Sequence, residues 1–452
     1  MTNAPLSPLA PPAGGWTVLI DELCQGQWRS PLTGELCPPA PYEAIEFADS
    51  LAGRSPELIK RAGLEGPLTV VADHNTWDIL GQQITREIFE HSGQAPAEVI
   101  LPSPKASLAH VADLALRIKN SRAIIAVGSG TINDLVKLST HQNGQHYCVF
   151  GTSPTMNGYT SSTASMNLDS GLKVSLAAHT PTGFFVDLSV SASAPPYQIA
   201  SGFGDCICRS VAQIDWWMSH RLLGTFYRTE PYLIEIPDEE ILNRHVTELA
   251  QREPNAIGYL YRVLTLCGLG ISFTGTSHHG SMGEHQISHY IDCFAGKKHP
   301  GSLHGQQVGV ASLTMARIQQ HFLSQSQPPQ LAPTALDPAG MARRMGTDVA
   351  DQCLKQLKKK ALDQEAATKL NRHLNEIWDD LRDECLTMAL PIEEMTHLLC
   401  EAGGATTAEE LGLDSLFYRE AISHAHEMRD RFSFADIAAH TGVLTDLAAA
   451  ET

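Results

Sequence analysis

The stretch AIIAVGSGTINDLVK, residues 123–137, decides the fold class of this 452-residue chain. It begins with an apolar, β-branched run typical of a buried strand and passes through Gly128, Ser129 and Gly130 into a helical pattern. Glycine lets the backbone approach a pyrophosphate closely, and the N–H groups at a helix start attract the anion. The stretch therefore predicts a strand–turn–helix unit that binds a nucleotide diphosphate. Because it lacks the third glycine of the usual dinucleotide fingerprint, a plain tight turn is the alternative.

Short apolar runs alternate with helical patterns on both sides of this unit. The alternation predicts βαβ units and a mostly parallel sheet, in a Rossmann-like domain over residues 55–195. Residues 1–54 are expected to form a flexible Pro-, Ala- and Gly-rich tail and a small β appendage outside the central sheet. Strands are expected at residues 68–73, 98–101, 123–127, 147–150, 172–176 and 184–190, and helices at 76–91, 108–119 and 131–141.

After Pro195 and Pro196 the strand signals stop, and long helical patterns follow. The fold class is therefore predicted as α/β plus all-α, with a helical domain over residues 196–452 that binds metal and substrate. A Pro- and Gln-rich loop is expected at 324–340. A cleft is expected between the two domains, because small-molecule sites usually form there.

A second polar loop, GTSPTMNGYTSS at residues 151–162, follows the next predicted strand. Its hydroxyls at Thr152, Thr155 and Ser161 could reach phosphate or ribose groups. Loops after consecutive parallel strands meet at the carboxyl edge of a sheet, where open α/β folds bind ligands. A turn that is merely rich in Ser and Thr is the alternative.

Charge and cysteine content narrow the function class. The chain carries 50 acidic and 32 basic side chains, a formal net charge of −18, and this argues against nucleic acid or an anionic membrane as a partner. A small-molecule substrate is expected instead. No apolar run approaches the roughly 20 residues of a membrane-spanning helix. The ten cysteines form no CxxC pair, which predicts reduced thiols in a cytoplasmic protein.

Three motifs of the second half carry metal-ligand chemistry. Asp205 follows GFG at a helix start, GEHQISH places His285 and His289 on one helix face, and His304 precedes a glycine. One carboxylate with two or three imidazoles suits Zn²⁺, Ni²⁺ or Fe²⁺ rather than Ca²⁺. Chance surface histidines and a capping aspartate are the alternatives. The adjacent pair His278 and His279 is interpreted as loop.

Five motifs in this order, GSGTINDLVK, TSPTMNGYTS, GFGD followed by AQIDWW, GEHQISH and LHGQQVGV, resemble the sn-glycerol-1-phosphate dehydrogenases. These enzymes belong to the superfamily of glycerol dehydrogenase, iron-dependent alcohol dehydrogenases and dehydroquinate synthase. The resemblance covers about residues 55–445, including MRDRFSFADIAAHTGVL near the end. It implies a Rossmann-like domain, a helical metal domain, bound NAD or NADP, and reduction of dihydroxyacetone phosphate to sn-glycerol 1-phosphate in phospholipid metabolism.

The resemblance also implies roles for individual residues. It implies that Asp205, His285 and His304 hold one divalent metal and that His289 contacts substrate. His289 is then a candidate for orienting a hydroxyl or relaying the proton. Asn157 and Asp205 are further substrate-binding candidates. The implied cofactor contacts are Asp73, Gly128, Ser129, Gly130, Thr131, Asp134, Thr152, Thr155 and Ser161.

The chain departs from the family pattern at two of these positions. Ser129 replaces the middle glycine of the family's Gly-Gly-Gly turn, which costs little if its φ is negative. Asn157 replaces an aspartate, keeping an acceptor but losing the charge. Two alternatives therefore stay open: a dehydrogenase of the same fold acting on another polyol or alcohol, and a dehydroquinate-synthase-like lyase or cyclase. The choice between NAD and NADP and assembly into a homo-oligomer are also open.

Overall fold

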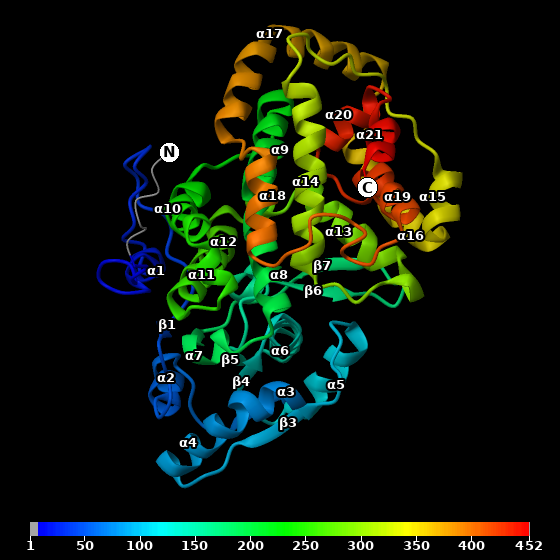
Figure 1. Cartoon of the computed structure of the whole chain (residues 1–452). Coiled ribbons are helices and arrows are strands. Elements are labelled where there is room, and N and C mark those ends of the chain that lie inside the picture. The colour runs from blue at the N-terminus through cyan, green and yellow to red at the C-terminus, as the bar shows by residue number, and fades with distance from the viewer. Residues whose placement is uncertain (1–7, 452) are drawn as a thin grey trace. The chain divides into compact units, whose positions relative to one another are not determined.

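The structure, a computed structural model, describes residues 8–451. By their contacts the residues group into two compact units (Figure 1). The first contains the residues up to Met166, Ser175–Gly202 and Glu230–Gly275, and the second contains Asn167–Val174, Phe203–Thr229 and the residues from Thr276 onward. Residues 230–275 thus group with the sheet, whereas the sequence pattern alone places them with the later helices.

The first unit is built on a parallel sheet of six strands in the order β1-β8-β5-β4-β2-β3. The predicted Rossmann-like sheet followed by a helical region is confirmed. The strands are β1 (Ala44–Ala48), β2 (Leu68–Asp73), β3 (Ala97–Leu101), β4 (Ala123–Gly128), β5 (His146–Gly151) and β8 (Gly183–Asp187).

The register of β4 against β5 brings the two predicted loops together. Gly128 lies opposite Gly151, so both loops leave the sheet side by side at its carboxyl edge. Helix α6 (Gly130–Asn143) begins directly after the first turn. The closeness of the two loops could be predicted from the sequence, because each loop follows one of two consecutive strands.

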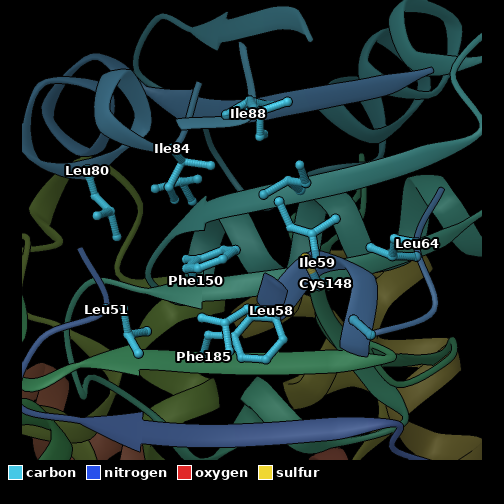
Figure 2. Close-up of a cluster of buried hydrophobic side chains, with 14 of the residues drawn as sticks. Leu51, Leu58, Ile59, Leu64, Leu80, Ile84, Ile88, Cys148, Phe150 and Phe185 are labelled. Carbon is cyan, nitrogen blue, oxygen red and sulfur yellow. The ribbon is translucent and has the colours of Figure 1, made fainter. Parts of the chain in front are cut away.

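One face of the sheet packs against α2 (Ser55–Arg61) and α4 (Gln82–Ser92). Figure 2 shows Leu58 and Ile59 from α2 and Ile84 and Ile88 from α4 over the sheet side chain Phe150. These side chains are all nearly inaccessible, and burial of each large aliphatic group contributes about 1.5–3 kcal/mol. This core fixes the strand ends that carry the loops.

The expectation for residues 16–54 was wrong. They form helix α1 (Val18–Cys24), a single bridge between Arg29 and Leu36, and strand β1, which is an edge strand of the central sheet and pairs in parallel with β8. Ile45 and Phe47, two residues apart on the strand and therefore on the same face of the sheet, are both buried. The partner strand lies far along the chain, so no local pattern reveals the pairing.

The expected flexible tail needs a correction as well. Its first seven residues lie outside the described residues, but the carbonyl of Leu9 accepts from Nδ2 of Asn255 at 2.7 Å. The Trp16 ring packs edge-on to Tyr259, with centroids 5.4 Å apart. Residues 9–16 are therefore held against α12 (Pro254–Thr274) of the same unit.

Several predicted elements differ in detail. The expected strand 172–176 belongs to a separate two-stranded sheet of β6 (Thr163–Asn167) and β7 (Lys173–Ala177). The strand expected at 184–190 ends at Asp187, because that carboxylate accepts from the N–H of Val190 and caps α7 (Leu188–Ala192). The expected helix 76–91 is divided into α3 (His74–Thr76), a π-helical turn and α4.

The remaining elements are helical. In the first unit they are α5 (Leu108–Ile118), α10 (Glu230–Arg244) and α11 (Val246–Ala250), while α8 (Pro196–Ile207) runs from the first unit into the second. None of the helices among residues 8–451 has the length and apolar character needed to cross a membrane. The second unit contains α9 (Arg209–Leu223), α13 (Gly283–Phe294), α14 (His304–Leu323), α15 (Pro338–Met345), α16 (Thr347–Lys360), α17 (Gln364–Met388), α18 (Ile392–Glu401), α19 (Ser415–His424), α20 (Phe434–His440) and α21 (Leu444–Ala450).

Candidate functional site

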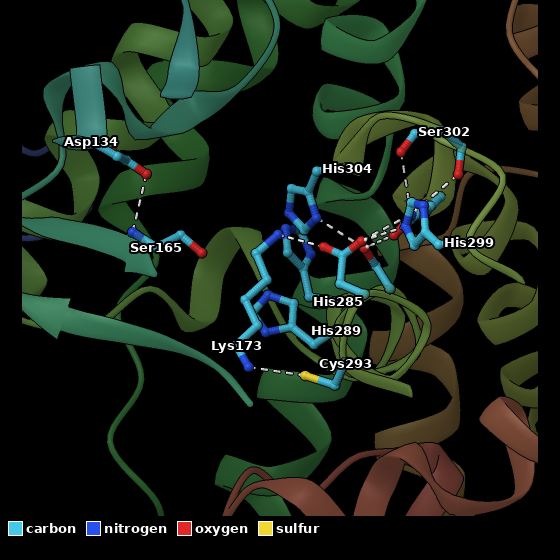
Figure 3. Close-up of polar contacts among 12 residues, drawn as sticks. Asp134, Ser165, Lys173, His285, His289, Cys293, His299, Ser302 and His304 are labelled. Atoms are coloured by element: carbon cyan, nitrogen blue, oxygen red, sulfur yellow. Dashed lines mark hydrogen bonds and ion pairs between the residues drawn. The ribbon is translucent and has the colours of Figure 1, made fainter. Parts of the chain in front are cut away.

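The second unit brings Asp205, His285 and His304 together. One ligand atom from each lies within 4.8 Å of the other two. Nε2 of His285 is 3.3 Å from Oδ1 of Asp205, and the rings of His285 and His304 are 5.0 Å apart. Figure 3 shows His285, His289 and His304 side by side. The donors come from α8, α13 and α14, so the arrangement is a product of tertiary packing.

Gly204 allows this close packing. A Cβ built on Gly204 would lie 2.1 Å from the carbonyl oxygen of Gly305, the residue after His304. Real Cβ atoms do not approach backbone so closely, so only glycine lets α8 contact the start of α14 here. The GFGD motif therefore has a steric role beside the chemical role of its aspartate.

The hydrogen bonds around the imidazoles fit a metal. Nδ1 of His285 donates to Oε1 of Glu284 at 2.7 Å, and Nδ1 of His304 is 2.9 Å from Oγ of Ser288. With each Nδ1 bonded, Nε2 of each ring is the atom that would bind a cation. Although burial opposes the charged form, the hydrogen bonds and charges of Asp205 and Glu284 raise the pKa of His285, and a cation would replace that proton. A partner on the far ring nitrogen is the usual second-shell arrangement of metal-binding histidines. Burial lowers the pKa of His304 to about 3, which leaves that ring in the neutral form a metal needs.

A series of hydrogen-bonded side chains extends from Ser288, the partner of Nδ1 of His304. Ser288 donates to Oε1 of Gln307 at 2.8 Å, and Nε2 of Gln307 donates to Oδ1 of Asp292 at 3.1 Å. Asp292 in turn pairs with Nζ of Lys173 at 2.5 Å. These groups are labelled in part in Figure 3. The network fixes the ring orientation of His304.

His289 lies next to the donor cluster but differs in its bonding. Its Nδ1 is 2.8 Å from a guanidinium nitrogen of Arg429, which can only donate. Nδ1 must therefore accept, and the ring proton sits on Nε2. Burial and the Arg429 charge hold the pKa of His289 well below its usual value. A neutral ring with Nε2–H is a hydrogen-bond donor, which suits a substrate-contacting group better than a metal ligand.

Asp215, within the AQIDWW motif, organises the same region. Its carboxylate accepts from the N–H groups of Gly283 at 3.2 Å and Phe434 at 3.0 Å, the first residues of α13 and α20. Gln319 of α14 donates to it as well, at 3.0 Å. Burial raises the pKa of Asp215 to about 7. The AQIDWW motif by itself indicates no role for Asp215, because the partners of this carboxylate lie far away along the chain.

A second donor group shares His285. Cys208, Glu284 and His285 also offer atoms within 4.8 Å of one another. However, the Cys208 thiol donates to the carbonyl of Asp205 at 3.2 Å. Burial lowers the pKa of His278 to about 3, and its ring packs near Trp216 with His279, in a short 3₁₀ helix. The hydrogen bond of the Cys208 thiol leaves Asp205, His285 and His304 better supported as a ligand set than the group that contains Cys208.

The predicted nucleotide loops lie in the first unit. Gly128 ends β4, and a Cβ there would lie 2.7 Å from the Ile132 side chain. Ser129 has φ −101°, which any residue adopts, and it precedes the first turn of α6 with Gly130 and Thr131. The turn therefore presents helix-start N–H groups at the sheet edge, as expected for anion binding.

Other predicted cofactor residues make internal contacts. Asp134 accepts from the N–H of Ser165 at 3.0 Å (Figure 3), and Asp73 caps α3 by accepting from the N–H of Thr76 at 2.8 Å. Ser161 donates to the carbonyls of Gly158 and Thr163. Their direct contact with a cofactor stays a prediction.

Three predicted residues of the second loop have different surroundings. Thr152 is buried, and its N–H donates to the carbonyl of Gly128 at 3.2 Å. Thr155 is half-buried. Nδ2 of Asn157 lies 3.5 Å from Sγ of Cys267 on α12. A substrate role for Asn157 stays a prediction too.

Lys137 was missed by the sequence reasoning. Its buried ammonium donates to the carbonyls of Gly158 at 2.6 Å and Thr163 at 3.0 Å and to Oγ of Ser161 at 3.3 Å. It thus joins the helix of the first loop to the backbone of the second. Burial lowers the pKa of Lys137 to about 8. The only signal available was a lysine on the buried face of a predicted helix.

Comparison with known proteins gives the family. Residues 46–195 match the model of the iron-containing alcohol dehydrogenases. The glycerol-1-phosphate dehydrogenase [NAD(P)+] of Bacillus subtilis is 27% identical over 88% of this chain and 91% of its own length. The enzyme of that name from Thermococcus kodakarensis is 28% identical over 62% of this chain and 78% of its own.

The chain is therefore similar to the iron-containing alcohol dehydrogenase superfamily, through residues 46–195 and through relatives that align with most of its length. In fold it is similar to a probable glycerol dehydrogenase from Sinorhizobium meliloti, with a TM-score of 0.60, 15% identity and coverage of 90% of this chain and 98% of the other. Glycerol dehydrogenase from Schizosaccharomyces pombe also gives 0.60, with 16% identity over 91% and 90%. The protein is a dehydrogenase of this family, whose members use NAD(P) and a divalent metal.

Proposed function

We propose that this protein transfers hydride from NAD(P)H to a small phosphorylated ketone, and that the reaction is the reduction of dihydroxyacetone phosphate to sn-glycerol 1-phosphate. One observation carries the proposal. Two buried donors, Asp205 and His285, and the half-buried His304 converge beside a neutral His289 that presents Nε2–H. At such a site a ketone oxygen would lie next to the positive charge of the bound cation and would accept a hydrogen bond from Nε2–H of His289.

The divalent cation would supply positive charge at the carbonyl oxygen, and NAD(P)H would supply the hydride. The chain's residues do the rest. Asp205, His285 and His304 would hold the cation, while Glu284 and Ser288 keep the two rings in the required tautomer. His289 would donate from Nε2 to a substrate oxygen and orient the ketone for attack. The reaction would consume one hydride from NAD(P)H and one proton from solvent, and would release the alcohol and NAD(P)+.

The substrate part of the proposal is supported by relatives. Those from Bacillus subtilis and Bacillus licheniformis, at 27% and 25% identity over 88% and 90% of this chain, are both named glycerol-1-phosphate dehydrogenases. Asn157 is the residue that favours the second candidate, an unphosphorylated polyol or alcohol, because an amide lacks the charge of the family's aspartate.

The test is a nicotinamide assay at 340 nm with purified full-length protein loaded with Zn²⁺, Ni²⁺ or Fe²⁺. Dihydroxyacetone phosphate, dihydroxyacetone and a longer phosphorylated ketone are compared with NADH and NADPH. The product stereochemistry is then read with an enzyme that oxidises only sn-glycerol 3-phosphate.

We expect the highest kcat/KM with dihydroxyacetone phosphate and a product that this second enzyme does not oxidise. Equal or better turnover of the unphosphorylated ketone would overturn the substrate assignment. A product released without net nicotinamide oxidation would instead identify lyase or cyclase chemistry, in which the cofactor is recycled within each turnover.

A further inference from the structure

Arg429 and Arg431, in the MRDRF stretch between α19 and α20, have no assigned role. Among the described residues neither guanidinium has a carboxylate within the 4.0 Å of an ion pair. The neighbouring acids are engaged elsewhere: Glu427 pairs with Arg344 at 2.7 Å and Asp430 with Lys359 at 3.0 Å. Two half-buried cations thus lie close together without an ion pair of their own among the described residues, although Glu284 and Asp430 act on Arg431 at longer range.

Arg429 is placed beside the candidate reaction centre. Within the described part of the chain, its guanidinium makes one hydrogen bond, the 2.8 Å contact with Nδ1 of His289. A guanidinium carries five N–H donors in a planar fork, so most of its donors remain for another ligand. The ring of His289 lies 5.6 Å from that of His304. One imidazole therefore separates Arg429 from the donor cluster.

Arg431 is bound differently. Its guanidinium donates to the carbonyl of Ser281 and, at 2.8 Å, to Oγ of Ser277. It thereby fastens the segment before α13 and adds a second positive charge near Arg429. Burial and the charge of Arg429 lower the pKa of Arg431 to about 9. Burial likewise lowers the pKa of Arg429. An anion between or beside these groups would offset the cost of burying both charges.

We infer that Arg429, backed by the charge of Arg431, binds the phosphate oxyanion of the substrate. This rests on the proposed function for the substrate class, but the subsite itself rests on the two guanidinium groups. In dihydroxyacetone phosphate one methylene and one ester oxygen separate the carbonyl carbon from phosphorus. That short span requires a phosphate site near the atoms that hold the carbonyl oxygen, and the hydrogen bond to His289 places the Arg429 guanidinium next to that cluster. Planar guanidinium groups bind phosphate through paired N–H···O bonds.

The experiment compares Arg429→Met and Arg429→Lys with Arg343→Met, a matched control. Arg343 is a highly exposed arginine of the same unit. The readout is the ratio of kcat/KM for dihydroxyacetone phosphate to kcat/KM for dihydroxyacetone. Because Arg429 also holds His289, any effect through that ring acts on both substrates and cancels in the ratio.

We expect Arg429→Met to lower this ratio about 100-fold, as for the loss of a charge-assisted contact. Arg429→Lys keeps the charge without the fork and should lower it about 10-fold. The control should leave the ratio within about twofold. A second readout is independent of turnover: calorimetric titration of the metal-loaded protein with inorganic phosphate should show binding to wild type and control that Arg429→Met loses.

The outcomes separate the two proposals. If wild type prefers the phosphorylated ketone and Arg429→Met keeps both the ratio and phosphate binding, the subsite is overturned and the proposed function stands. If wild type shows no preference but Arg429→Met still abolishes phosphate binding, the subsite stands and the substrate assignment fails. A variant that does not fold is recognised by circular dichroism, and Arg429→Lys then decides the matter.

Discussion

Nδ1 of His285 lies 2.7 Å from Oε1 of Glu284, its neighbour in sequence. The same carboxylate oxygen accepts from the N–H of Met282 at 2.8 Å, so its position is set by backbone. A carboxylate in this place orients the ring and increases the electron density at Nε2. The acid that precedes the histidine in GEH therefore belongs to the candidate metal site, although the sequence motif by itself points only to the histidines.

Glu284→Gln should lower metal affinity about 10- to 100-fold while the protein stays folded, because the amide can hydrogen-bond but lacks the charge. The dissociation constant is measured by competition with a chromophoric chelator. Glu393→Gln, a substitution in the first turn of α18, is the matched control. Unchanged affinity in Glu284→Gln would show that the carboxylate does not act on His285.

His285→Ala and His289→Ala should separate metal binding from turnover. The first removes a ligand and should lose most of the metal together with activity. The second should keep near-stoichiometric metal and lose about 10²- to 10⁴-fold in kcat, the range for a lost proton-handling group. Metal is measured by mass spectrometry of the dialysed protein. Full metal content and rate in His285→Ala would refute the ligand set.

Gly204→Ala should disrupt the site without touching a ligand. The new methyl would lie 2.1 Å from the carbonyl oxygen of Gly305, so α8 and the start of α14 must separate. We expect a destabilisation of about 1–3 kcal/mol and a clear loss of metal affinity. Gly309→Ala is the control, since its methyl would meet the end of the Leu399 side chain, which can move, at 3.0 Å and would lie 3.4 Å from Cα of Gly204, much farther than the 2.1 Å of the test variant. Equal effects of the two variants would contradict the steric role.

Lys137 predicts a pH-dependent stability. Its folded pKa of about 8 lies below the ordinary 10.5, so between these values the unfolded chain holds a proton that the folded chain has released. Stability must therefore rise with pH in this window. Relative to Lys137→Met, wild type should gain about 2 kcal/mol between pH 7 and pH 9.5. Urea unfolding of both proteins across this pH range measures the difference between their free energies of unfolding. If that difference does not change with pH, Lys137 does not cause the effect.

Local sequence was sufficient to predict the elements whose defining residues are neighbours along the chain. A β-branched run followed by Gly128, Ser129 and Gly130 specified a strand, a turn and a helix, because all the determining contacts lie within about fifteen residues. The i, i+4 spacing of His285 and His289 placed both on one face of α13 for the same reason.

Tertiary structure decided everything that depends on distant partners. The pairing of β1 with β8, the contact of Gly204 with Gly305, and the bond from Arg429 to His289 each join segments separated by about a hundred residues or more. That last bond alone distinguishes His289 from the ligands. Composition and periodicity report only on neighbours along the chain, whereas the tautomer of a ring and the convergence of three donors are set by whichever side chains packing brings beside them.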